Sequence, residues 1–158
     1  MMKIKDKIGV KGKVVCTLRN VHTGEKRVVE YYNLNPAVGR NAIATRLAGG
    51  GSDGDLAISY GAVGTDATAP ASGDTTLGTS LKRKAVTLIS SSGSSVNVRV
   101  YFSSGEGNGS LKEFGLFGGG SATATQDTGT LFQRVAINIT KSSSETLTIE
   151  SSININEG

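Results

Sequence analysis

TLFQRVAINIT (130–140) and SSVNVRVYFSS (94–104) decide the fold of this 158-residue chain, because apolar and polar side chains alternate strictly along both. A period of two places the apolar side chains on one face of a β-strand and the polar ones on the other. ETLTIESSINI (145–155) repeats the pattern. The three apolar rows are Val96, Val98, Val100 and Phe102; Leu131, Val135, Ile137 and Ile139; and Leu147, Ile149, Ile153 and Ile155. Strands that are buried on one face and exposed to solvent on the other are typical of antiparallel sheets. We therefore predict a mainly β protein, an antiparallel β-sandwich with one short α-helix that is described below.

The remaining strands follow from apolar runs separated by turn residues. We expect three antiparallel hairpins, and they join 11–20 to 27–35, 82–92 to 94–104, and 130–140 to 145–155. Thr23-Gly24, SSGS and KSSSE supply their turns. Two further strands are predicted at 55–64 and 111–119, with a loop over 65–78.

One helix is expected over residues 35–48. Asn35 can cap it and Pro36 suits the first helical position, where its missing N–H costs nothing. Gly49-Gly50-Gly51 ends it, because glycine readily adopts the left-handed conformation of a helix C-cap. Val38, Ala42, Ile43 and Leu47 are expected along one side.

We expect a basic N-terminal strand pair or arm at 1–34, and a β-sandwich domain at 35–158 that begins with the helix. Residues 1–46 hold ten Lys and Arg against three Asp and Glu, a net charge of +7, so the rest carries −3. Lys3, Lys5 and Lys7 are candidates for contact with an acidic neighbouring subunit, and a solvated strand face is the plainer interpretation. We do not expect nucleic acid as a partner, because no aromatic residues are interleaved with these lysines.

Residues for catalysis are scarce. His22 is the single histidine and falls in a predicted turn, where an exposed surface residue is expected. Cys16 is the single cysteine and is expected to be a small buried hydrophobe. We therefore expect no Cys/His nucleophile pair between a buried Cys16 and an exposed His22, and a single histidine cannot form a His-rich zinc site within one chain. Glu106 and Glu113 are the nearest candidates for a carboxylate pair, but Glu106 falls in the turn-like SGEGNG. We expect no enzymatic activity, no small-molecule substrate and no cofactor.

The chain shows no apolar signal-peptide region and no long apolar run, so we expect neither secretion by a leader nor a membrane span. A protein of this kind is expected to be made in the cytosol.

Two stretches resemble a pattern found in tail-fibre and tail-collar-fibre proteins of tailed bacteriophages. They are ISYGAVGTDATAPASGDTTLGTSLKRKAV (58–86) and LKEFGLFGGGSATATQDTGTLFQRVAI (111–137), and NPAVGRNAIATRLAGG (35–50) resembles the helix that precedes them. The residues that carry the resemblance are Gly61, Gly64, Thr65, Pro70, Asp74, Thr75, Leu77, Glu113, Phe114, Gly115, Leu116, Phe117, Leu131, Phe132 and Arg134. Fibre proteins of this kind continue into a shaft and a receptor-binding tip, whereas we expect a single β domain, without shaft or tip, in this chain.

The resemblance implies a particle-attached structural subunit, made in a bacterial host and built into the virion. Its partners would be copies of itself and other virion proteins of the tail, baseplate or collar. A capsid decoration protein or head fibre is the alternative within this class, and a receptor- or carbohydrate-binding β-sandwich is the alternative outside it. Besides the N-terminal lysines, Thr65, Pro70, Asp74 and Leu77 of the loop are candidate subunit contacts. Glu113 is expected to form a structural ion pair, with Arg134 or with Arg83.

Overall fold

The computed structural model describes residues 8–51 and 56–157, with the side chains of residues 8, 156 and 157 left out. This part of the chain holds nine strands and one helix. Their bounds are β1 (Ile8–Asn20), β2 (Lys26–Tyr32), α1 (Ala37–Leu47), β3 (Ile58–Gly64), β4 (Ser80–Ala85), β5 (Leu88–Ser92), β6 (Ser95–Phe102), β7 (Gly109–Gly118), β8 (Thr130–Lys141) and β9 (Glu145–Glu157).

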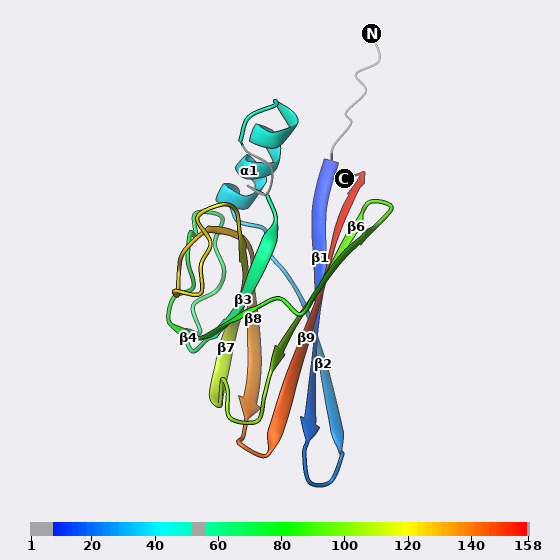
Figure 1. Ribbon diagram of the computed structural model, residues 1–158, viewed down its shortest axis with the longest axis vertical. Coiled ribbons are helices and arrows are strands. Elements are labelled where there is room, and N and C mark those ends of the chain that lie inside the picture. Colours follow the sequence, from blue (N-terminus) through cyan, green and yellow to red (C-terminus); the bar gives the residue numbers. More distant parts are fainter. Residues whose placement is uncertain (1–7, 52–55, 158) are drawn as a thin grey trace.

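The strands form two antiparallel sheets that face each other, with α1 at one end (Figure 1). One sheet has five strands in the order β2-β1-β9-β6-β5, and the other has four in the order β4-β3-β7-β8. The predicted β-sandwich with one short helix is confirmed. β1 lies between β2 and β9 and pairs with β9 from Ile8 to Asn20, so the N-terminal strand pair is part of the larger sheet.

The core is built from the alternating rows that the sequence indicated. Side chains from both sheets fill it, and the buried residues of three strands are Val98, Val100 and Phe102; Leu131, Val135, Ile137 and Ile139; and Leu147, Ile149 and Ile153. Ile155 is an exception, because it is 41% exposed. β8 is buried on both faces between Leu131 and Val135, since the helix and the loop after β3 cover its outer side.

One predicted pairing and one predicted strand are wrong. β8 and β9 are not a hairpin but belong to different sheets, and their apolar rows face each other across the core. The single strand expected at 82–92 is two strands, β4 in the smaller sheet and β5 in the larger. The hairpin between β5 and β6 is confirmed, and so is the one between β1 and β2.

The helix begins at Ala37, one residue after the expected first helical position. Pro36 is the N-cap residue and makes no side-chain cap, while the Asn35 amide instead donates to the Val10 carbonyl at 2.8 Å. The helix ends before Gly49, which has a φ of 78°. Gly39 lets α1 lie directly on β8, because a Cβ there would sit 2.9 Å from the Phe132 Cα. No helix within the described ranges is long and apolar enough to cross a membrane.

Candidate functional site

A buried ion-pair cluster joins the smaller sheet to the loop at 65–79, and its centre is Arg134 of β8. Glu113 of β7 lies beside it, and the side chains of Glu113 and Arg134 are only 1% and 4% exposed. The Arg134 Nη2 donates to the Glu113 Oε2 at 2.8 Å and the Nε donates to the same oxygen at 3.1 Å. Of the two partners that the sequence left open for Glu113, the structure places Arg134 against it.

The remaining donors of Arg134 reach the loop. Its Nη1 donates to the Asp74 Oδ2 at 2.7 Å, and its Nη2 donates to the Thr68 carbonyl at 3.3 Å. The Asp66 Oδ2 is 3.7 Å from Nη2. A planar guanidinium with donors in a fixed fork can hold several acceptors at once, so a single side chain fixes two parts of the loop to β8.

Glu113 holds the end of the same loop. Its Oε1 accepts from the Thr79 N–H at 2.8 Å and its Oε2 accepts from the Gly78 N–H at 2.9 Å. Each oxygen of a carboxylate that is almost fully buried is therefore hydrogen-bonded, which a buried charge requires.

Glycines make room for this cluster. A Cβ on Gly64 would overlap the Glu113 Oε1 and the Thr79 carbonyl, and one on Gly78 would overlap the Asp66 carboxylate. Gly115 faces Leu77 in the same way, because a Cβ there would lie only 2.8 Å from the Leu77 Cδ2. These glycines serve the close approach of loop and sheet.

Opposite charges dominate the electrostatics. Burial alone lowers the pKa of Arg134, but hydrogen bonds to Asp74 and Glu113 outweigh it and leave the pKa raised. Burial likewise acts to raise the pKa of Asp74, yet the Ala71 N–H and Arg134 hold it below its ordinary value. Arg134 and Asp74 therefore each favour the charged form of the other.

The predicted contact residues of the loop fall into two kinds. Leu77 is 4% exposed and packs inside this chain against Phe117 and Leu131, and Asp74 binds Arg134. Thr65 is exposed and Pro70 half-buried, so these two remain on the surface. Lys3, Lys5 and Lys7 lie outside the described residues. The contact role of all seven stays a prediction.

Sequence reasoning missed Asp66 as a member of the site, and it offered Arg83 only as a possible partner of Glu113. Asp66 accepts from the Thr68 N–H at 2.9 Å, and the Asp-x-Thr spacing in GTDAT was a signal for such a turn. Arg83 of β4 lies between two aromatic rings, 4.7 Å from the centre of Tyr60 and 4.5 Å from that of Phe117. No local sequence signal marks that stacking, because the three residues come from three strands.

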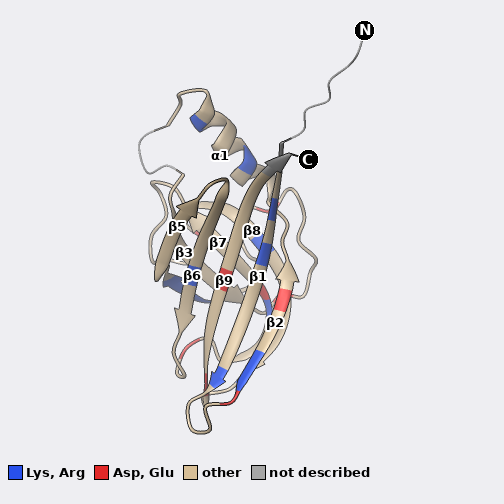
Figure 2. Ribbon diagram, turned by 90° about the vertical axis from the view of Figure 1, so that its right-hand side faces the viewer, with Lys and Arg blue, Asp and Glu red and all other residues tan. Residues whose placement is uncertain are grey.

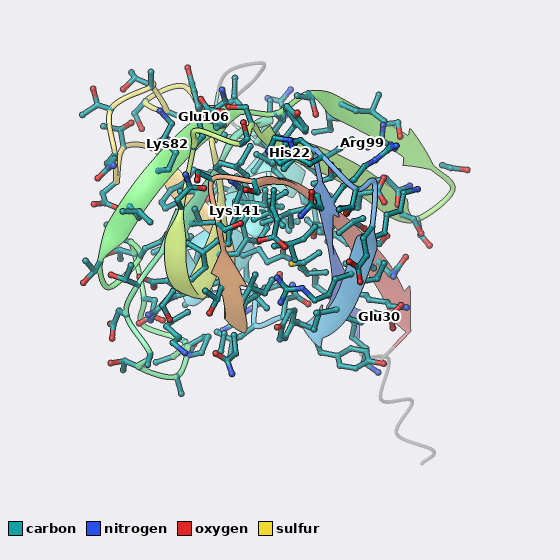
Figure 3. The ribbon with its side chains drawn as sticks, turned by 90° about the horizontal axis from the view of Figure 1, so that it is seen from below. His22, Glu30, Lys82, Arg99, Glu106 and Lys141 are labelled. Carbon is teal, nitrogen blue, oxygen red and sulfur yellow. The ribbon has the colours of Figure 1, made fainter. Side chains whose placement is uncertain are left out.

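A second polar cluster lies at the opposite end of the sandwich from α1 (Figure 3). Lys141, only 1% exposed, donates to the Ser103 carbonyl at 2.9 Å and to the Asn108 Oδ1 at 2.6 Å. Glu106 of the same loop accepts from Lys84 at 2.7 Å and from the Ser103 N–H at 3.0 Å. Hydrogen bonds to Lys84 and Ser103 lower the pKa of Glu106 to about 2. Glu106 and Glu113 thus serve separate ion-pair clusters, each with its own cation.

Neither cluster presents a group of three or more His, Cys, Asp or Glu side chains suited to a metal ion, and the same holds throughout residues 8–51 and 56–157. His22 is exposed in the turn between β1 and β2, as predicted. Cys16 is fully buried in the core, also as predicted.

No family model, curated protein or solved structure matches this chain.

A groove of about 840 Å³ lies along the larger sheet. It crosses the solvent-facing side of β1, β9 and β6, and its lining includes Arg19, Lys26, Arg99, Tyr101 and Glu150. Arg99 donates to Glu150 at 2.6 Å within the groove. The groove therefore combines one aromatic ring with four threonines, three basic side chains and one acidic side chain.

Proposed function

We propose that this chain is a structural subunit of a bacteriophage virion, a tail, baseplate or collar component that works through contacts with copies of itself and with neighbouring virion proteins. One observation carries the proposal. Asp74, Glu113 and Arg134, which belong to three separate parts of the fibre-like pattern, meet in one buried cluster.

This clustering supports the resemblance, because the residues of the pattern then share one structural role. Its charged residues hold a long loop against a sheet, and its glycines allow the close approach. A loop fixed in this way loses little conformational freedom when it docks on a partner, and preorganisation of that kind favours assembly. Thr65 and Pro70 lie on the surface of the fixed loop, where a neighbouring subunit can reach them.

Particles of the phage that encodes the chain provide the test. Gold-labelled antibodies raised against the purified chain should mark intact particles at one position on the tail, baseplate or collar. Gold spread over the head would instead support a capsid decoration protein or head fibre. Purified particles that lack the chain altogether would refute the virion role.

A second candidate function, a carbohydrate- or receptor-binding β-sandwich, is favoured by the groove on the larger sheet. Sugars bind where an aromatic ring lies beside polar groups, and Tyr101 offers one such ring, 40% exposed. A glycan array should give saturable binding that Tyr101→Ala removes and Tyr32→Ala keeps, because Tyr32 is exposed but lies outside the groove. An array without saturable binding would count against this function.

A further inference from the structure

The outer edge of β5 has no strand partner within the part of the chain that the structure describes. Among the described strands β5 pairs with β6 alone, and all five of its residues are exposed. The free edge of a strand presents unpaired N–H and C=O groups that can bind another strand, so most proteins protect it with charges, proline or a cover. β5 has the sequence LISSS, with neither charge nor proline, and Figure 2 shows it uncharged along its whole length at the side of the larger sheet.

The other sheet edges in the described part of the chain are protected. β2 carries Lys26, Arg27 and Glu30. β4 has the sequence SLKRKA, and the Leu81 carbonyl accepts a hydrogen bond from Gln126 in the loop after β7. β8 is bridged to Leu34, just beyond β2. This contrast makes the bare edge of β5 a specific feature of the molecule and not a general property of its strands.

Apolar side chains add to the open edge. Leu88 and Ile89 are each 45% exposed. Ile89 also lines an apolar pocket of about 260 Å³ beneath α1, together with Ile43, Ile153 and Ile155. Exposed apolar surface beside unpaired backbone is typical of a site that another chain covers.

We propose that β5 pairs antiparallel with β5 of a second copy, around a two-fold axis at Ser90, so that the two five-stranded sheets become one. This inference rests on the proposed assembly function and names the surface that it uses. In this register Leu88 lies opposite Ser92 of the other copy and Ile89 lies opposite Ser91, so each large side chain meets a small one. A two-fold interface uses the same patch on both copies, and a strand without charge brings no like charges together.

The neighbouring strand is compatible with this pairing. Arg99 of β6 lies directly beside Leu88, and it is already paired with Glu150 of β9. The charged group nearest the junction is therefore neutralised within each copy. That favours a second copy over a partner of opposite charge.

The first experiment places a charge on the edge. Ser91→Lys is compared with Val28→Lys, which adds the same charge to the exposed edge strand β2. Light scattering across a concentration series should show self-association of the wild type, weakened at least about tenfold by Ser91→Lys and unchanged by Val28→Lys. Thermal unfolding checks that both variants remain folded.

The second experiment tests the register. Directly opposed residues of an antiparallel pair have Cα atoms about 4.5–5.5 Å apart, which is within the range of a disulfide. Ser90→Cys should therefore give a covalent dimer under mild oxidation, whereas Ser142→Cys, in an exposed turn, should not. Cys16 does not compete, because it is fully buried.

Each outcome bears on the inference. A wild type that stays monomeric at every concentration overturns it, and so does association that Ser91→Lys and Val28→Lys change equally. A Ser90→Cys chain that forms no more covalent dimer than Ser142→Cys also overturns it. None of these results touches the virion role, which fails only if purified particles lack the chain.

Discussion

Glu113 of β7 and Arg134 of β8 form a buried ion pair with an oxygen–nitrogen distance of 2.8 Å, and the same two side chains hold the loop at 65–79 on the sheet. Arg134 is bonded to Glu113, Asp74 and Thr68, and Glu113 is bonded to Gly78 and Thr79. Removal of either member therefore affects the loop as well as the pair.

Arg134→Met should destabilise the chain strongly. The substitution leaves the buried carboxylate of Glu113, and the partly exposed one of Asp74, without their cation. The loss of a partner from a buried pair costs roughly 3–5 kcal/mol. Urea unfolding measures the change. Arg99→Met is the matched control, because the Arg99–Glu150 pair is about half exposed, and exposed pairs contribute about 0–1 kcal/mol. Equal effects of the two substitutions would contradict the structural role of the buried pair.

Gly64→Ala should destabilise the chain because its methyl group would overlap the Glu113 carboxylate and the Thr79 carbonyl. Overpacking of this kind typically costs about 1–3 kcal/mol. Gly73→Ala lies in the same loop with open space around the position, so its free energy of unfolding should stay within about 0.5 kcal/mol of the wild type. Chemical denaturation of both variants compares them, and a neutral Gly64→Ala would refute the close approach.

Glu106 should contribute to a loss of stability in acid. Its pKa is lowered from 4.5 to about 2 by Lys84 and Ser103. A group whose pKa is lower in the folded state stabilises that state above its unfolded pKa, and the contribution disappears as the pH falls through the folded pKa. The difference in free energy of unfolding between wild type and Glu106→Gln should therefore be constant above a pH of about 4.5. It should become smaller as the pH falls toward about 2. Unfolding experiments at a series of pH values measure it, and a difference independent of pH would contradict the assignment.

Cys16 should be unreactive until the chain unfolds. The side chain is fully buried, and burial raises the pKa of its thiol to about 12. Because the thiolate is the reactive form, alkylation should be blocked in the native protein and rapid in concentrated guanidinium chloride. Mass spectrometry after timed alkylation gives both rates. Fast labelling of the folded chain would place Cys16 outside the core.

The strands and their buried faces, but not all of their pairings, could be predicted where the alternation is strict. Val98, Val100 and Phe102 lie in the core as expected, because a side chain's position along a strand determines its face. The pair Glu113–Arg134 could be predicted only in part. The sequence offered two partners for Glu113, and only the register between β7 and β8 brings Arg134 beside it.

The long-range polar contacts could not be predicted. Lys141 directly follows a predicted strand, yet its ammonium group is buried against the loop at 103–108, which belongs to a distant part of the sequence. Arg83 is likewise held by rings from two other strands. Such contacts depend on which elements become neighbours, and no local pattern encodes that.

Residue alternation alone determined that this chain is a β-sandwich and which side chains face its core. The tertiary structure decided that β8 and β9 lie in different sheets, and that β4 and β5 do as well. The physical reason is that two apolar rows are buried equally well side by side in one sheet or opposite each other across a core. The choice between these arrangements depends on the packing of the whole chain, including the loop that Arg134 fixes and the edge that β5 leaves open.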